Sequence, residues 1–147
     1  MTIQQIIETL NTFTPFEEDD LENDNESCFY ALMEEVKKSK DYELAFDPIF
    51  KLIEKYPQAD FGTPGPFVHT LESFPGKYED YLFESLKRKP TSLTVLMFNR
   101  IINGEQNSII KQNLIDRLPL LLDHPLINEE TVNTIKGFIE YQNEATR

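Results

Sequence analysis

Apolar residues recur at helical spacing along almost the whole chain. The first segment carries Ile3, Ile6 and Leu10 behind Thr2, a residue type that favours the N-cap of a helix. Positions three and four residues apart share one face of a helix, so this spacing predicts an amphipathic helix. The same spacing predicts further helices over about 26–39, 41–56, 66–74, 77–88, 92–103, 107–122 and 128–142.

Prolines and glycines punctuate this pattern. Pro48 interrupts the stripe over 41–56, so that helix is expected to start there or to kink, and Pro57 ends it. Short connections of this kind make neighbouring helices antiparallel. We therefore expect an all-α fold, a single domain over 1–147 with seven to eight short antiparallel helices. HEAT-like helical hairpins and an irregular bundle both remain open, because no repeated signature is visible.

The predicted core is densest in residues 92–103, which are apolar nearly all round. A helix of that composition is buried centrally. A strand is the competing prediction for residues 93–98, but the flanking cap residues and Gly104 favour a helix. The segment 107–122 is expected to add Ile110, Leu114 and Leu118 to the core.

The chain is strongly acidic. It has 26 Asp and Glu against 14 Lys and Arg, a formal net charge of −12. Such a field repels nucleic acids and anionic membranes and attracts basic partners. The one dense basic cluster, residues 86–90, falls at a predicted helix C-terminus, where the helix dipole favours cations.

The negative charge is concentrated in residues 17–26, which hold seven of the 26 acids. Without them the chain has 19 acids against 14 bases, an ordinary balance. A solvated loop explains such a run, but its unevenness favours a surface for a basic partner. We call residues 17–26 the acidic strip and take its carboxylates as candidate partner-binding residues: Glu17, Glu18, Asp19, Asp20, Glu22, Asp24 and Glu26.

We expect the chain to be cytoplasmic. Cys28 is the one cysteine, so no internal disulfide forms. The N-terminus lacks the basic and apolar regions of a signal peptide, and no apolar run reaches membrane-spanning length.

Catalytic, metal and cofactor sites are not predicted. His69 and His124 are the only histidines, and no G-x-S-x-G elbow or glycine-rich phosphate loop is present. His69 and Glu72 are spaced to share a helix face, but two ligands do not make a zinc site. An EF-hand starting at Asp20 fails, because Asn25 and Ala31 stand where glycine and glutamate are needed. An enzyme would need a histidine joined to carboxylates in a pocket.

Two segments of residues 61–104 resemble a known family. FGTPGPFVHTLE contains the pattern G-x-P-G-P-x-V-H, and the later stretch contains S-x-x-R-x-P-T followed by N-R-I-I-N. Together they cover about a third of the chain, and both are unusual in composition. They are similar to the bacterial immunity proteins encoded beside polymorphic or contact-dependent toxins.

The resemblance implies a stoichiometric inhibitor that binds a cognate toxin, not an enzyme. Its motif residues are expected mostly to shape the fold: Gly62, Pro64, Gly65, Pro66, His69, Asn99 and Arg100. Of these, Asn99 and Arg100 are expected to be buried and to form hydrogen bonds. The negative charge of the chain further predicts that the toxin is basic, and a nuclease is the favoured class of toxin. The alternative is a HEAT-like scaffold or regulatory adaptor that binds another protein or peptide.

Overall fold

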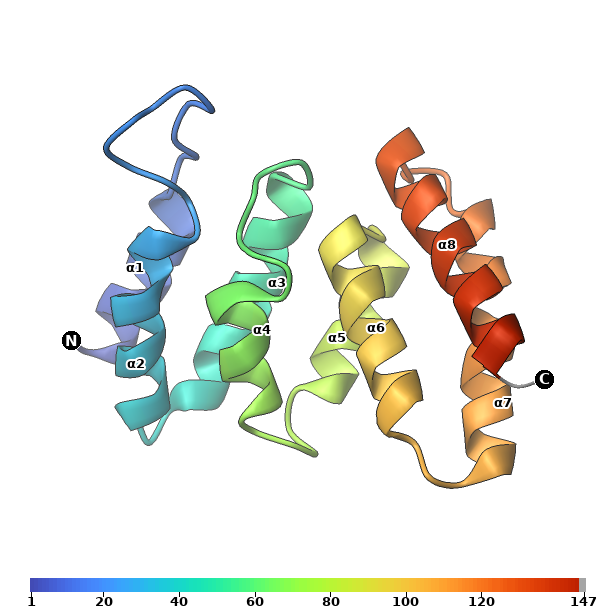
Figure 1. Ribbon diagram of the computed structural model, residues 1–147. Helices are drawn as coiled ribbons and strands as arrows, with labels where there is room; N and C mark the ends of the chain where they lie inside the picture. Colours follow the sequence, from blue (N-terminus) through green and yellow to red (C-terminus); the bar gives the residue numbers. More distant parts are fainter. Residues whose placement is uncertain (146–147) are drawn as a thin grey trace. The chain divides into compact units, whose positions relative to one another are not determined.

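The computed structural model describes residues 1–145, which form eight α-helices and three short 3-10 helices and contain no strand (Figure 1). The α-helices are α1 (Ile3–Thr12), α2 (Tyr30–Lys38), α3 (Phe46–Lys55), α4 (Gly65–Glu72), α5 (Glu79–Arg88), α6 (Ser92–Gly104), α7 (Ser108–Arg117) and α8 (Glu129–Ala145). The 3-10 helices are η1 (Ser27–Phe29), η2 (Tyr42–Ala45) and η3 (Pro119–Asp123). The predicted all-α fold is confirmed.

The chain divides into two compact units, unit 1 over Met1–Phe83 and unit 2 from Glu84 onward. Within unit 1, α1 lies against α3 and α2 lies against α4. This is the pairing produced when one helical hairpin stacks on the next. Within unit 2, α6 packs against α7 and α8. The single domain over 1–147 stays a prediction.

Phenylalanines fill the core of unit 1. Phe29 and Phe67 have ring centroids 4.6 Å apart, and Phe61 lies 5.2 Å from Phe67. All three rings are buried, as are the predicted core residues Leu32 and Val36 of α2. The aromatic cluster therefore joins the chain entering α2 to the turn that precedes α4.

The helix starts follow the local sequence. Thr2 accepts a hydrogen bond from the Gln5 N–H, and the Gln5 side chain accepts one from the Thr2 N–H, which is a capping box. Pro48 neither starts nor breaks α3, contrary to the expectation. It is the third residue of the helix, where a backbone N–H has no partner within the helix anyway.

The core of unit 2 differs from the prediction in one helix. Val95, Met97 and Phe98 of α6 are buried as expected, but Ile110 of α7 is 48% exposed. The buried residue of α7 is Ile115. Ile110 lies five residues earlier, about 140° round a helix of 3.6 residues per turn, so it faces away from the core.

No helix in residues 1–145 combines the length and the apolarity needed to cross a membrane.

Candidate functional site

The acidic strip belongs to the loop that joins α1 to η1 (Figure 1). Of the two structures expected for these residues, a loop or a solvated helix entrance, the loop is observed. The strip contains one large apolar residue, Leu21, which is 98% exposed. Its carboxylates divide into two groups according to what their oxygens contact.

Three carboxylates, those of Asp20, Asp24 and Glu26, hold the loop in shape. Asp20 accepts hydrogen bonds from the N–H groups of Glu22 and Asn23 at 2.9 and 3.0 Å. Asp24 accepts one from the Ser27 N–H at 2.7 Å, at the entrance of η1. Short acidic side chains commonly stabilise turns by bonding to the backbone ahead of them.

These backbone contacts also stabilise the ionised form of the two aspartates. The Glu22 and Asn23 N–H groups lower the pKa of Asp20 below its ordinary value, and the Ser27 N–H does the same for the pKa of Asp24. A carboxylate that accepts N–H groups is stabilised in its ionised form. Both side chains therefore contribute negative charge and shape together.

Glu26 ties the end of the strip to the first residue of α2. Its carboxylate accepts a hydrogen bond from the Tyr30 hydroxyl at 2.8 Å, and this contact raises the pKa of Tyr30. A Cβ placed on Gly62 would lie 3.0 Å from the same Glu26 oxygen. The strip thus ends directly beside the turn that leads to α4.

The other four carboxylates are available to a partner. Within the described part of the chain their oxygens accept no hydrogen bond and form no ion pair, and all four residues are exposed. We call them the free acids: Glu17, Glu18, Asp19 and Glu22.

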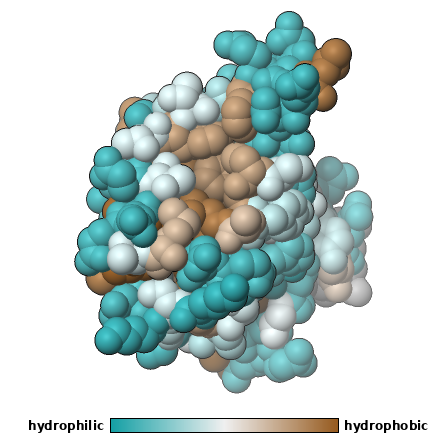
Figure 2. Space-filling model, turned by 90° about the vertical axis from the view of Figure 1, so that its left-hand side faces the viewer, coloured by the Kyte–Doolittle hydropathy of each residue, from teal (hydrophilic) through white to brown (hydrophobic). Residues whose placement is uncertain are grey.

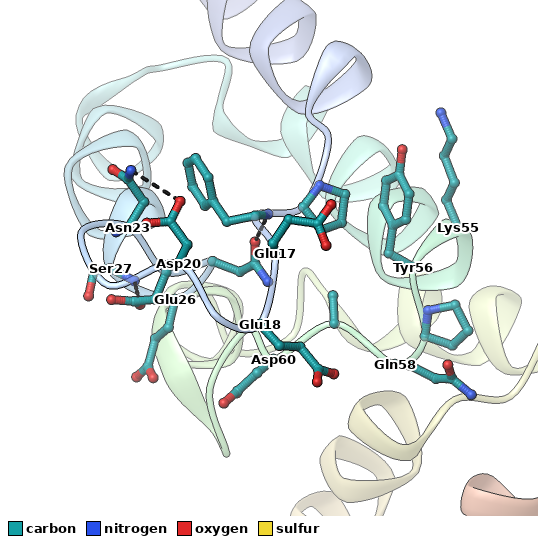
Figure 3. A pocket seen from close by; sticks show the side chains of 16 residues that line it. Glu17, Glu18, Asp20, Asn23, Glu26, Ser27, Lys55, Tyr56, Gln58 and Asp60 are labelled. Atoms are coloured by element: carbon teal, nitrogen blue, oxygen red, sulfur yellow. Dashed lines mark hydrogen bonds between the residues drawn. The ribbon is translucent and has the colours of Figure 1, made fainter.

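The strip forms one wall of a cleft of about 850 Å³, and the residues that follow α3 form the other (Figure 3). Six carboxylates line this acidic cleft, and Lys55 is the one cation among its lining residues. The acids of the cleft are Glu17, Glu18, Asp20, Asp24, Glu26 and Asp60. Lys55 extends over the Tyr56 ring, 5.4 Å from its centroid. The space is therefore strongly negative and suits a cationic group.

Two of the predicted strip residues lie outside this cleft. Asp19 and Glu22 are exposed but do not line it. Asp60 also lines the cleft, although no sequence pattern connects it to the strip. The structure therefore brings together five of the seven predicted carboxylates and adds one from the connector after α3.

The histidines are not gathered into a metal or catalytic cluster. No group of three His, Cys, Asp or Glu residues suited to a metal ion occurs among residues 1–145. His124 has a structural contact: its Nδ1 accepts the Leu126 N–H at 3.1 Å. Its Nε2–H therefore donates to the Lys87 carbonyl, 2.7 Å away, near the C-terminus of α5. His69 lies exposed on α4.

The residues of the immunity-like motifs fall into different environments. Gly62 and Gly65 adopt φ of +98° and +80°, and the Thr63–Pro64 peptide bond between them is cis. Asn99 is buried, and its Oδ1 accepts a hydrogen bond from Gln142 Nε2 at 2.7 Å, which links α6 to α8. The expectation that Arg100 is buried is wrong, because Arg100 is exposed on the outer side of α6.

The sequence reasoning missed the aromatic residues beside the strip. Residues 11–15, which include Phe13, are predicted only as a break after the first helix, and Phe16 has no predicted role. Their rings lie 6.0 Å apart, and Phe13 lies 4.7 Å from Phe29. The signal was the recurrence of phenylalanine on both sides of the acidic run, at 13, 16 and 29.

No family model, curated protein or solved structure matches the chain.

Proposed function

We propose that this chain is an immunity protein, which binds a cognate bacterial toxin stoichiometrically and blocks it without catalysing a reaction. The acidic cleft is the observation that carries the proposal. Six carboxylates and one ammonium line it, so a partner that enters it gains by presenting Lys or Arg. The motifs at residues 62–69 and 85–103 support the same function by resemblance.

A basic nuclease is the favoured toxin. A nuclease holds the phosphate backbone of its substrate in a cationic groove. An acidic loop that projects free carboxylates competes with phosphate for that groove. Glu17 and Glu18 combine this exposure with a place in the cleft, so they are expected to contribute most to toxin contact.

The hydrogen bonds within the strip favour tight association. Asp20, Asp24 and Asn25 hold the loop through bonds to backbone N–H groups. A loop that is already ordered loses less conformational entropy on binding. Asp20 and Asp24 therefore hold the loop in one conformation, and the free acids contact the partner.

The test uses the protein encoded by the adjacent upstream gene. The variant E17Q/E18Q/D19N removes three free acids, and the control D123N/E140Q/E144Q removes three exposed acids of the same kinds from unit 2. We expect the unaltered chain and the control to form an equimolar complex and to suppress the toxic activity. The strip variant should bind at least about tenfold more weakly.

The outcomes separate function from interface. Absence of both a complex and protection would refute the immunity function. A complex that is weakened equally by the two triple variants would refute the strip as the contact surface.

The alternative is a HEAT-like scaffold or regulatory adaptor. The stacking of α1 on α3 and of α2 on α4 favours it, because stacked hairpins are a common peptide-binding architecture. Genome context discriminates between the two functions: a toxin-domain gene next to this one favours immunity, and a signalling or metabolic operon favours the adaptor.

A further inference from the structure

An apolar groove of about 430 Å³ opens between α1 and the start of α2. We call it the aromatic groove. Its apolar walls are formed by Phe13, Phe16, Phe29 and Leu32, and Thr9 and Glu35 supply polar atoms at its border. Cys28 also lines it and is exposed.

The groove is built on the core of unit 1. Phe29 and Leu32 are 2% and 7% exposed and form a fixed base. Phe13 and Phe16 are half-exposed and form a rim that a ligand can cover. Edge-on contacts of Phe13 with Phe16 and with Phe29 hold this rim in place. The groove is therefore preformed, as sites for apolar anchors usually are.

Figure 2 shows the surface formed by α1 and α2, where an apolar area lies below a hydrophilic projection. By its place in Figure 1 this projection is the loop that carries the acidic strip. Phe16 lines both the aromatic groove and the acidic cleft. The two sites are therefore neighbours on one surface, with an apolar part and a strongly negative part.

We propose that the aromatic groove receives a bulky apolar side chain from a basic segment of the protein partner, whose Lys and Arg side chains contact the acidic strip. This inference rests on the proposed function for the identity of the partner. An apolar anchor in a pocket surrounded by charged contacts is the usual arrangement of a binding hot spot. Glu35 at the groove is already paired with the Met1 ammonium at 3.7 Å, so the strip beyond Phe16 is what selects for positive charge around the anchor.

A second copy of this chain fits the groove poorly. A symmetric dimer through this surface would bring two acidic strips close together. Each strip carries seven carboxylates, and the whole chain has a net charge of −12. Like charges placed against each other across an interface are costly, so a basic partner is the occupant that the charges favour.

The first test uses synthetic helical peptides and needs no toxin. One peptide places Leu on one face and Lys on the other, a second replaces Leu with Ser, and a third replaces Lys with Glu. We expect the Lys/Leu peptide to bind and the Leu-to-Ser peptide to bind at least about tenfold more weakly, as loss of one buried anchor implies. The Lys-to-Glu peptide should also bind at least about tenfold more weakly, because the acidic strip repels its carboxylates. Fluorescence anisotropy measures the affinities.

Cys28 reports whether the groove is the site. It is the one cysteine of the sequence, so maleimide alkylation labels this position alone. Bound Lys/Leu peptide should slow the alkylation, and the Leu-to-Ser peptide should not at the same concentration. Binding of the Lys/Leu peptide without protection of Cys28 would overturn the proposal.

A matched pair of variants locates the contact. Thr9 and Thr12 are both exposed on α1, and each hydroxyl donates to the carbonyl four residues earlier, at 2.9 and 2.8 Å. Thr9 lines the groove and Thr12 does not. We expect T9K to weaken the Lys/Leu peptide at least about tenfold, and T12K, which adds the same charge, to leave its affinity within about twofold.

Equal effects of T9K and T12K would overturn the groove as the site. So would concentration-dependent dimerisation of the protein alone that protects Cys28. The same variants separate this inference from the immunity function. Loss of toxin binding by T9K alone supports the groove, whereas full toxin neutralisation by T9K refutes it and leaves the immunity function standing. Peptide binding in the groove without any toxin neutralisation refutes the immunity function instead.

Discussion

The turn over residues 62–65 is where single-residue geometry is most restrictive. Gly62 has φ of +98°, and a Cβ on it would overlap with the backbone of Gly65 and crowd the Glu26 carboxylate. The Gly65 backbone cannot move cheaply, whereas the Glu26 carboxylate is the end of a side chain and moves at the cost of its hydrogen bond to Tyr30. The turn and the end of the acidic strip are therefore shaped together.

We predict that G62A lowers the free energy of unfolding by about 1–3 kcal/mol, because the alanine is strained in φ and meets the backbone of Gly65. The control is G137A in α8, where a Cβ meets nothing within 4 Å. That change should stabilise by about 0.5–1 kcal/mol, the ordinary preference of a helix for alanine. Urea unfolding measures both. An unfolding midpoint for G62A that equals or exceeds that of the original chain would contradict the prediction.

The aspartates of the strip make its order dependent on pH. Backbone N–H groups lower the pKa of Asp20 and of Asp24 in the folded chain. A group with a lowered folded pKa stabilises above its unfolded value and loses that contribution as the pH falls through the folded pKa. We predict that the Glu22, Asn23 and Ser27 amides lose protection from hydrogen exchange as the pH falls below about 3.8, the ordinary aspartate pKa.

Carbon-13 titration of the carboxyl groups checks this prediction directly, with midpoints for Asp20 and Asp24 below the ordinary value. D20N is the control, because an amide oxygen still accepts the Glu22 and Asn23 N–H groups but does not titrate. In D20N, the Glu22 and Asn23 amides should show no loss of protection from hydrogen exchange as the pH falls. Midpoints at or above the ordinary value would show that the backbone contacts do not stabilise the charge.

At the scale of elements, capping boxes start two of the helices. Thr91 and Thr94 exchange hydrogen bonds at the start of α6, where both are buried. Thr2 and Gln5 form the corresponding box of α1 at an exposed position. A buried N–H that loses its partner costs more than an exposed one, which bonds to water instead.

We therefore predict that T91A lowers the free energy of unfolding by about 1–2 kcal/mol and T2A by only about 0.5 kcal/mol. T91S is the control, because it keeps the hydroxyl and should recover most of the loss. Thermal or urea unfolding measures the three variants. Equal losses for T91A and T91S would mean that the methyl group matters and the cap does not.

The helices were predictable because their apolar spacing and their caps agree. Thr2 was predicted as a cap residue and lies at the N-cap of α1, and of Thr91 and Ser92, the two cap residues that the sequence offers for α6, the structure has Thr91 at the N-cap. Ile110 was assigned to the core because spacing alone does not fix which side of a helix faces its neighbours. The start of α7 at Ser108 and its packing on α6 decide that orientation.

The candidate site was predictable only in part. The strip was visible as an unbroken run of acids, but the separation into structural and free acids depends on turn hydrogen bonds that composition does not reveal. The aromatic groove needs Phe13 and Phe29 in contact, and they are sixteen residues apart in the chain. Their contact follows from the packing of α1 against α2, which no local pattern specifies.

At the scale of the whole molecule, the charge is both a general field and a local contact. In the proposed complex, the net charge of −12 would attract the basic partner from a distance, and the free acids would contact it at close range. Salt screens these effects, since the Debye length is about 8 Å at physiological ionic strength. Contacts in the aromatic groove are apolar and do not depend on salt in this way.

The two sites should therefore affect different rate constants of toxin binding. We predict that E17Q/E18Q/D19N slows association about tenfold at low salt and makes it less dependent on salt, with dissociation changed much less. T9K should dissociate faster than T12K and associate at nearly the same rate, because both add one positive charge and only the Lys at position 9 obstructs the groove. Stopped-flow mixing with the toxin over a series of salt concentrations measures both constants. The control D123N/E140Q/E144Q separates the local effect from the loss of net charge, and a salt dependence equal to that of the strip variant would assign the attraction to the whole molecule.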